Sequence, residues 1–362
     1  MDARQVRERE KDFINLPVVT AIGTEIIDNA KTRLSDKIYA RNARTLTVLW
    51  SEKLNFNAVA SIRSDGTHEI TFNYGVSVET YRDAFLLPQF CVREFSKPQY
   101  DELFEALSFD GRRQALPVGL SVEDAKIDIQ VFGLTWLYAH EQAHLFQHHG
   151  ECEAQLLGLK DGPDGSSLSE LPVNGATPLS GAHASIRHAL ELAADHEATL
   201  FLISSLSAGS GLTPSKLWCF VVSLMCTFLR LHNETDAGAV SAPFGSHPKP
   251  AYRMRIAIRQ ILGLFDLPDV EGRFQGIRDP AHAAQIMEHA SLTATVYWHI
   301  RYLKREKFPE FLKNALLPTS VPEEYAKAVF WTWASLRPLV LTKADGWGQG
   351  SVMYLRDFES LM

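Results

Sequence analysis

The stretch from Leu134 to His148 reads LTWLYAHEQAHLFQH and places a His-Glu-x-x-His motif inside an apolar helical pattern. Side chains four residues apart lie on one face of a helix, about 6 Å from each other, so the imidazoles of His140 and His144 can bind one zinc ion. Glu141 then lies beside the metal, where a carboxylate can take a proton from a bound water. The stretch therefore predicts a helix that carries two metal ligands and a general base.

Spacing excludes two ways of completing this site. The metzincin class has Gly and His where this chain has Gln147 and Gly150, so that class is excluded. His148 continues the same helix face, but it lies two turns, about 12 Å, from His140. We therefore expect His148 to be a neighbour of the site and not a ligand.

A catalytic zinc ion usually has three protein ligands, so the chain has to supply one more. Glu191 and Asp195 share a face of a second helical segment, and we predict Glu191 as the third ligand. Asp195 is predicted to orient a zinc-bound histidine, as carboxylates behind metal ligands commonly do. Asp195, His188 and His183 remain alternative ligands. The other histidines are predicted to be structural or solvent-facing: His149, His196, His232, His282, His289 and His299.

The order of the motifs resembles that of the gluzincin metallopeptidases. The His-Glu-x-x-His motif is followed by Glu191-x-x-x-Asp195 and then by His247-Pro248, with Arg253 six residues after that histidine. The nearest similarity is to the CAAX-prenyl endopeptidases and HtpX-type proteases, where a His-Pro-x-x-x-x-Arg element follows the same two helices. The resemblance implies that His247 lies near the metal and stabilises the oxyanion, and that Arg253 belongs to the catalytic group. The alternative is that His247 and Pro248 form a turn and that Arg253 pairs with an acid.

The resemblance covers only residues 130–260. Those relatives are membrane-embedded, whereas the most apolar run of this chain, residues 217–229, is well short of the roughly 20 residues that span a bilayer. It is predicted to be a buried helix, so we expect no stable membrane insertion. The soluble phage-exclusion Lit-type peptidases of bacteria are therefore a closer analogy.

The amino-acid composition limits which cellular compartment and which kinds of binding partner we expect. Acidic residues outnumber basic ones 43 to 36, a net charge of −7, which offers no basic surface for nucleic acid. None of the 4 cysteines belongs to a Cys-x-x-Cys pair, and residues 1–12 lack the apolar core of a secretion signal. We expect a cytoplasmic protein that does not bind nucleic acid.

The predicted fold class is α+β, mainly α-helical, with a zincin-like core. An α+β region over residues 1–120 is expected to precede the zinc-binding helices of residues 121–262, and residues 263–362 form a helical subdomain. Short β-branched or aromatic segments predict a small amino-terminal sheet over residues 45–50, 57–62 and 69–74. The last two segments are predicted to form a hairpin, and segment 69–74 to be an edge that an extended substrate could join.

Helical spacing predicts a long helix that starts at Ser121, runs to about His149 and ends at Gly150. A loop rich in glycine, proline and serine is predicted over residues 160–181. Other predicted helices cover residues 1–35, 182–206, 214–231 and 251–262. Three tryptophans are predicted to lie in the core: Trp331, Trp333 and Trp347.

The function expected from these features is zinc-dependent hydrolysis of peptide bonds in an intracellular protein, with Glu141 as general base. The partner is then a protein or peptide substrate, and the oligomeric state stays open. The alternative is a non-catalytic, zinc-binding regulatory or interaction protein. A structural zinc site would close its fourth position with another Cys or His, and neither Cys91 nor Cys152 has suitable spacing.

Overall fold

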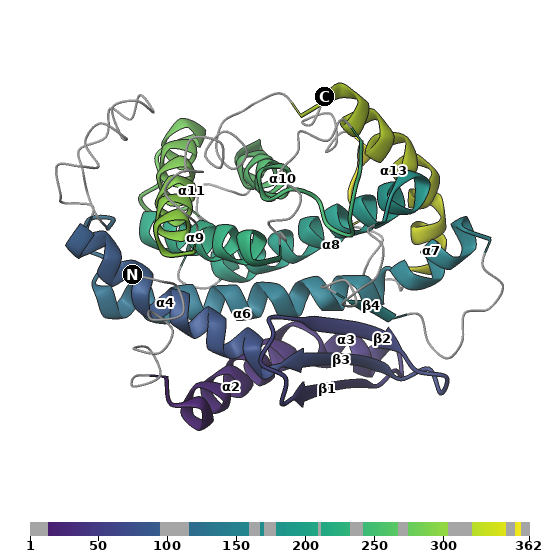
Figure 1. Cartoon of the computed structure of the whole chain (residues 1–362), viewed down its shortest axis with the longest axis horizontal. Helices are drawn as coiled ribbons and strands as arrows, with labels where there is room; N and C mark the ends of the chain where they lie inside the picture. Colours follow the sequence, from purple (N-terminus) through teal and green to yellow (C-terminus); the bar gives the residue numbers. More distant parts are fainter. Residues whose placement is uncertain are drawn as a thin grey trace.

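The computed structural model describes residues 14–94, 116–158, 167–169, 179–208, 211–231, 242–266, 274–302, 321–344 and 352–355. This part of the chain is mainly helical with one small sheet, which confirms the predicted α+β class (Figure 1). The helices are α2 (Leu16–Leu34), α3 (Asp36–Arg41), α4 (Tyr74–Glu94), α6 (Val122–Phe146), α7 (His149–Leu156), α8 (Gly181–Ala208), α9 (Pro214–Leu231), α10 (Pro250–Gly263), α11 (Pro280–Tyr302) and α13 (Glu323–Lys343). A single 3₁₀ turn, η2 (Leu264–Asp266), follows α10.

The sheet has the strand order β1-β3-β2-β4, with β1 (Leu46–Ser51), β2 (Ala58–Ile62), β3 (His68–Asn73) and β4 (Ser167–Ser169). The predicted hairpin of β2 and β3 is confirmed, because these strands pair antiparallel, while β1 pairs parallel with β3. The prediction of an edge strand at residues 69–74 is wrong, since β3 lies between β1 and β2. Among the strands that the structure describes, β1 and β4 form the edges.

Helix α6 crosses the middle of the molecule, with the sheet and α2 on one side and α8 and α9 on the other (Figure 1). Its start is as predicted, because the Ser121 side chain accepts a hydrogen bond from the backbone N–H of Asp124 at 3.0 Å. Every residue from Phe132 to Phe146 except Thr135 is buried. The sequence around the motif is therefore apolar because this part of α6 is covered on several sides by other parts of the protein.

The predicted end of α6 at Gly150 is wrong. The helix ends at Phe146, and His148 adopts a left-handed conformation with φ 49° and ψ 41°. Gly150 lies inside α7, which begins at His149. The side chain of His148 lies 3.3 Å from Arg44 Nη1 and 2.9 Å from Glu151 Oε1. These contacts hold a backbone conformation that is unfavourable for residues other than glycine.

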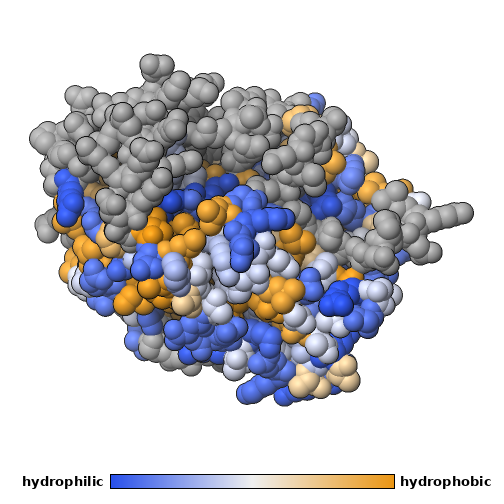
Figure 2. All heavy atoms as spheres, turned by 60° about the horizontal axis from the view of Figure 1, so that its bottom comes forward, coloured by the Kyte–Doolittle hydropathy of each residue, from blue (hydrophilic) through white to orange (hydrophobic). Residues whose placement is uncertain are grey.

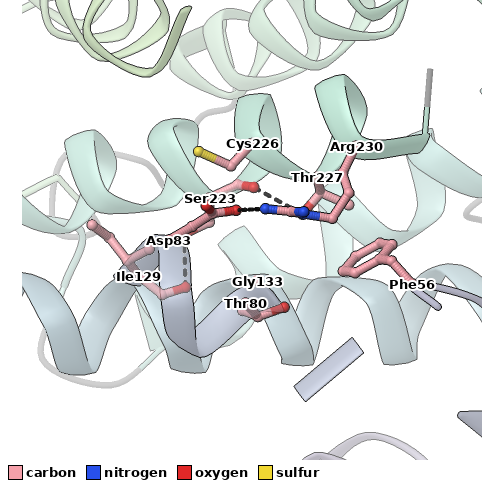
Figure 3. Close-up of a pocket in the computed structure, with 9 residues that line it drawn as sticks. All are labelled: Phe56, Thr80, Asp83, Ile129, Gly133, Ser223, Cys226, Thr227 and Arg230. Atoms are coloured by element: carbon pink, nitrogen blue, oxygen red, sulfur yellow. Dashed lines mark hydrogen bonds and ion pairs between the residues drawn. The ribbon is translucent and has the colours of Figure 1, made fainter. Parts of the chain in front are cut away.

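Helix α9 is the one helix in the described segments that is long and apolar enough to cross a membrane, but 78% of it is buried inside the protein. It packs against α6 and α11, so the prediction of a buried helix is confirmed. Arg230 near its end donates to Asp83 at 2.5 Å and to Glu79 at 2.6 Å. Arg230 and Asp83 line a pocket between α4, α6 and α9 (Figure 3). This ion-pair network ties α9 to α4.

Two apolar cores organise the helices. One combines side chains from α2, the sheet, α4, α6, α9 and α11 with part of α8 and α10, and the other joins other residues of α8 and α10 to α13. Trp333 is fully buried in the second core as predicted, whereas Trp331 is 66% exposed, which contradicts its predicted place in the core. Trp347 lies outside the described residues.

The predicted loop over residues 160–181 is only partly described. Strand β4 lies within this range and pairs antiparallel with β2, so these three residues are not loop. Residues 159–166 and 170–178 lie outside the described part of the chain, as do residues 1–13 of the predicted first helix. Figure 2 shows the face that carries α2 and β1, where apolar side chains lie among polar ones. Leu16 and Val18 of α2 and Leu49 of β1 are exposed.

Candidate metal centre

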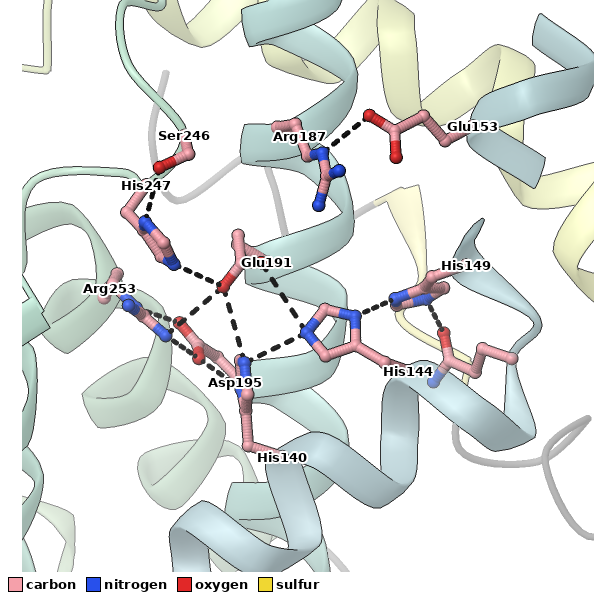
Figure 4. Close-up of polar contacts among 11 residues, drawn as sticks. His140, His144, His149, Glu153, Arg187, Glu191, Asp195, Ser246, His247 and Arg253 are labelled. Carbon is pink, nitrogen blue, oxygen red and sulfur yellow. Dashed lines mark hydrogen bonds and ion pairs between the residues drawn. The ribbon is translucent and has the colours of Figure 1, made fainter. Parts of the chain in front are cut away.

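The predicted site residues come from three places in the fold, which are α6, α8 and the segment that leads into α10. Their side chains meet at one point (Figure 4). His140, Glu141 and His144 lie in the last two turns of α6, and Glu191 lies on α8, which packs against α6. Glu141 is fully buried in the helix turn between the two histidines. His140, His144 and Glu191 are 0%, 3% and 3% exposed. The fold therefore buries several ionisable side chains next to one another. Buried ionisable groups need hydrogen bonds, an opposite charge or a metal ion.

Donor atoms of three side chains converge in a way that fits a metal ion. His140 Nε2 lies 3.0 Å from His144 Nε2, and Glu191 Oε2 and Oε1 lie 3.4 and 3.6 Å from these two nitrogens. Ligands at 2.0–2.1 Å from a tetrahedral ion are separated by about 3.3–3.4 Å. The three observed distances lie close to this spacing, so each of the three side chains could supply one ligand. This buried His-His-Glu group could hold a metal ion.

Asp195 lies behind His140, as predicted. Its Oδ1 is 3.0 Å from His140 Nδ1. Because a carboxylate only accepts hydrogen bonds, this contact favours a proton on Nδ1 and leaves the lone pair of Nε2 directed at the other donors. Asp195 is thus placed to orient His140.

Arg253 on α10 pairs with Asp195. Its Nε and Nη2 donate to the two carboxylate oxygens at 2.7 and 2.6 Å, and Nη2 lies 3.7 Å from Glu191 Oε2. Burial alone would raise the pKa of Asp195, but the charge and hydrogen bonds of Arg253 outweigh burial and hold this pKa below its ordinary value. The alternative in which Arg253 pairs with an acid is therefore the observed one. We treat Arg253 as a positioning residue.

His247 lies next to the donor group, in the segment before α10. Its Nε2 is 3.6 Å from Glu191 Oε2, and its Nδ1 is 2.8 Å from Ser246 Oγ. The segment is fixed to the residues before α8, because the backbone N–H of Gly245 donates to Leu179 O at 2.9 Å. This placement agrees with the position that the motif resemblance implies for His247.

The alternative third ligands lie outside the donor group. His188 Nδ1 is 2.9 Å from the hydroxyl of Tyr325, and His183 Nε2 is 3.0 Å from Glu153 Oε1. Burial, and then the nearby His247, lowers the pKa of His188 to about 3, so this imidazole is neutral. Glu191 is thus the predicted candidate that the structure places with the two histidines of α6.

Three residues near the site were not predicted from the sequence. His149 was expected to be structural or solvent-facing; it is fully buried, and its Nδ1 lies 2.8 Å from His144 Nδ1, a contact with the site that was not predicted. Gln147 contacts His149, and Glu197 contacts Gln147. The spacing held no signal for His149, because five residues along an ordinary helix do not return to the same face. Only the left-handed turn at His148 brings it back.

Comparison of the chain with known protein families, curated proteins and solved structures identifies no relative. No protein-family model matches the chain, and no curated protein and no solved structure is significantly similar to it. The metal centre is therefore inferred from the geometry of His140, His144 and Glu191 together with the order of the motifs.

Proposed function

We propose that the chain is a zinc-dependent endopeptidase of the gluzincin type, in which His140, His144 and Glu191 hold the metal. The observation that carries the proposal is the convergence of these side chains: the two Nε2 nitrogens lie 3.0 Å apart, and each lies 3.4 or 3.6 Å from one of the two carboxylate oxygens of Glu191. Three protein ligands of the His₂Glu type leave a fourth position for water, as catalytic zinc sites do. Bound zinc lowers the pKa of that water and polarises the scissile carbonyl.

Glu141 is the general base in this proposal. Its carboxylate takes a proton from the attacking water as the water oxygen bonds to the carbonyl carbon, and it returns the proton to the nitrogen as the carbon–nitrogen bond breaks. His247 lies at the edge of the donor group and donates to the developing oxyanion. Arg253 and Asp195 keep His140 oriented and make no contact with substrate.

The substrate of the proposal is a protein or peptide in an extended conformation. Of the two edge strands in the described part of the sheet, β4 is the better one for such a substrate, because it contacts α7, which directly follows the metal-binding helix. An edge strand offers backbone hydrogen bonds that do not depend on the substrate's side chains. All four cysteines are buried and form no disulfide bond. Because thiols stay reduced in the cytosol, we propose that the protein is cytoplasmic.

The alternative is a non-catalytic zinc-binding protein. A structural site would be expected to supply a fourth Cys or His. In the described segments, the group that could hold a metal has three members, and it has a glutamate between its two histidines. Both features favour catalysis over a structural role.

Metal removal tests the proposed activity. We expect the zinc-loaded protein to cleave members of a diverse peptide library read by mass spectrometry, and cleavage to fall to background with a chelator such as 1,10-phenanthroline, because both water activation and carbonyl polarisation are lost. Added zinc should restore the same cleavage products. Cleavage that persists in the chelator, or no cleavage by zinc-loaded protein, would contradict the proposal.

A further inference from the structure

A chain of buried polar side chains runs from α8 to the metal-binding face of α6. Gln147 Nε2 donates to Glu197 Oε2, Gln147 Oε1 lies 2.9 Å from His149 Nε2, and His149 Nδ1 lies 2.8 Å from His144 Nδ1. Gln147, His149 and Glu197 are fully buried. Each of these three contacts is short enough for a hydrogen bond, so each has a donor and an acceptor.

The carboxylate at one end sets the direction of the whole chain. Glu197 only accepts, so the NH₂ group of Gln147 faces it and the amide oxygen faces His149. That oxygen also only accepts, so His149 carries its hydrogen on Nε2. In the arrangement with both rings neutral, His149 Nδ1 accepts and His144 Nδ1 donates. His144 then presents the lone pair of Nε2, which lies 3.0 Å from His140 Nε2 and 3.6 Å from Glu191 Oε1.

The two metal-binding histidines are therefore held in the same way by two acids of one helix. Asp195 reaches His140 directly, while Glu197, two residues later on α8, reaches His144 through Gln147 and His149. We propose that Glu197, Gln147 and His149 form a relay that fixes the tautomer and the ring orientation of His144, so that its Nε2 is ready to bind metal. This inference rests on the metal site of the proposed function and is independent of the reaction that the site performs.

The backbone supports this relay. The left-handed conformation of His148 ends α6 and starts α7 in a new direction, which brings His149 back to His144. Arg44 and Glu151 contact the His148 side chain and hold the turn. Unfavourable backbone conformations persist where their surroundings fix them, often at functional sites.

Zinc affinity measured by competition with a chromophoric chelator tests the relay without any activity assay. We expect His149→Phe, which keeps a buried ring but removes the acceptor, to weaken zinc binding by about 10–100-fold, the usual cost of losing a partner behind a metal ligand. Glu197→Gln is nearly isosteric but no longer fixes the Gln147 amide, so we expect a smaller loss in the same direction. Glu153→Gln is the matched control. It replaces a buried carboxylate that pairs with Arg187 outside the relay, and zinc affinity should not change.

A second measurement separates positioning from a general loss of structure. In ¹⁵N-histidine-labelled zinc-loaded protein, long-range ¹H–¹⁵N spectra should show His144 protonated on Nδ1, and this signal should shift or broaden in Glu197→Gln at an unchanged melting temperature. Equal zinc affinity in wild type, His149→Phe and Glu197→Gln would overturn the relay while leaving the metal site intact. A wild-type protein that binds no zinc would instead overturn the proposed function.

Discussion

Replacing Glu141 with glutamine is expected to lower kcat for peptide hydrolysis by about a hundred- to ten-thousand-fold, the range that positioned acid–base groups contribute. The amide has nearly the same shape as the carboxylate, but it cannot take a proton from water and return it to the leaving amine. Because Glu141 is not one of the three donors of the metal group, zinc content and KM should stay close to those of the wild type.

Glu153→Gln serves as the control for this prediction as well. It makes the same chemical change at another buried glutamate, on α7, which contacts His183 and Arg187. Its kcat should remain within a few-fold of the wild type. If Glu141→Gln binds zinc and keeps more than a tenth of the wild-type kcat, Glu141 is not the general base.

Replacing Arg253 with methionine is expected to lower the free energy of unfolding by about 3–5 kcal/mol, the usual cost of removing one partner of a buried ion pair. Asp195 would then be a buried carboxylate without its two hydrogen bonds from the guanidinium. Since Asp195 also orients His140, zinc affinity should fall together with stability. Chemical denaturation of the zinc-free protein and zinc competition measure the two effects separately.

Two further variants make this prediction specific. Arg259→Met alters an exposed arginine on the same helix and should change the unfolding free energy by no more than about 0.5 kcal/mol. Arg253→Lys keeps the charge but loses the planar, two-pronged geometry, so its stability should lie between wild type and Arg253→Met. Equal stability of Arg253→Met and wild type would show that the pair does not hold the site.

Much of the helical framework could be predicted because its signals are local. The bounds of α9 are the predicted residues 214–231, where a proline starts an apolar run, and Ser121 marks the start of α6 with its side-chain cap. The site residues within each helix were predictable for the same reason, whereas the packing of α8 against α6, which brings them together, is not a local signal. His140 and His144 are four residues apart, and so are Glu191 and Asp195. Each pair therefore needs only a helix to lie on one face.

The features that escaped prediction depend on contacts between distant residues. The order of the strands is set by pairing of β3 with both β1 and β2, which no single segment specifies. Trp331 and Trp333 lie two residues apart on α13 and so face different sides, and one is exposed while the other is buried. The turn at His148 uses a histidine where a glycine was expected, so the relay through His149 had no sequence signature.

Elemental analysis combined with X-ray absorption of the purified protein tests whether His140, His144 and Glu191 bind a zinc ion. We expect one zinc per chain, bound by two imidazole nitrogens and by oxygen at about 2.0–2.1 Å, and a large loss of zinc in Glu191→Ala. Protein without zinc after loading, a sulfur ligand at about 2.3 Å, or equal zinc in Glu191→Ala would contradict this expectation.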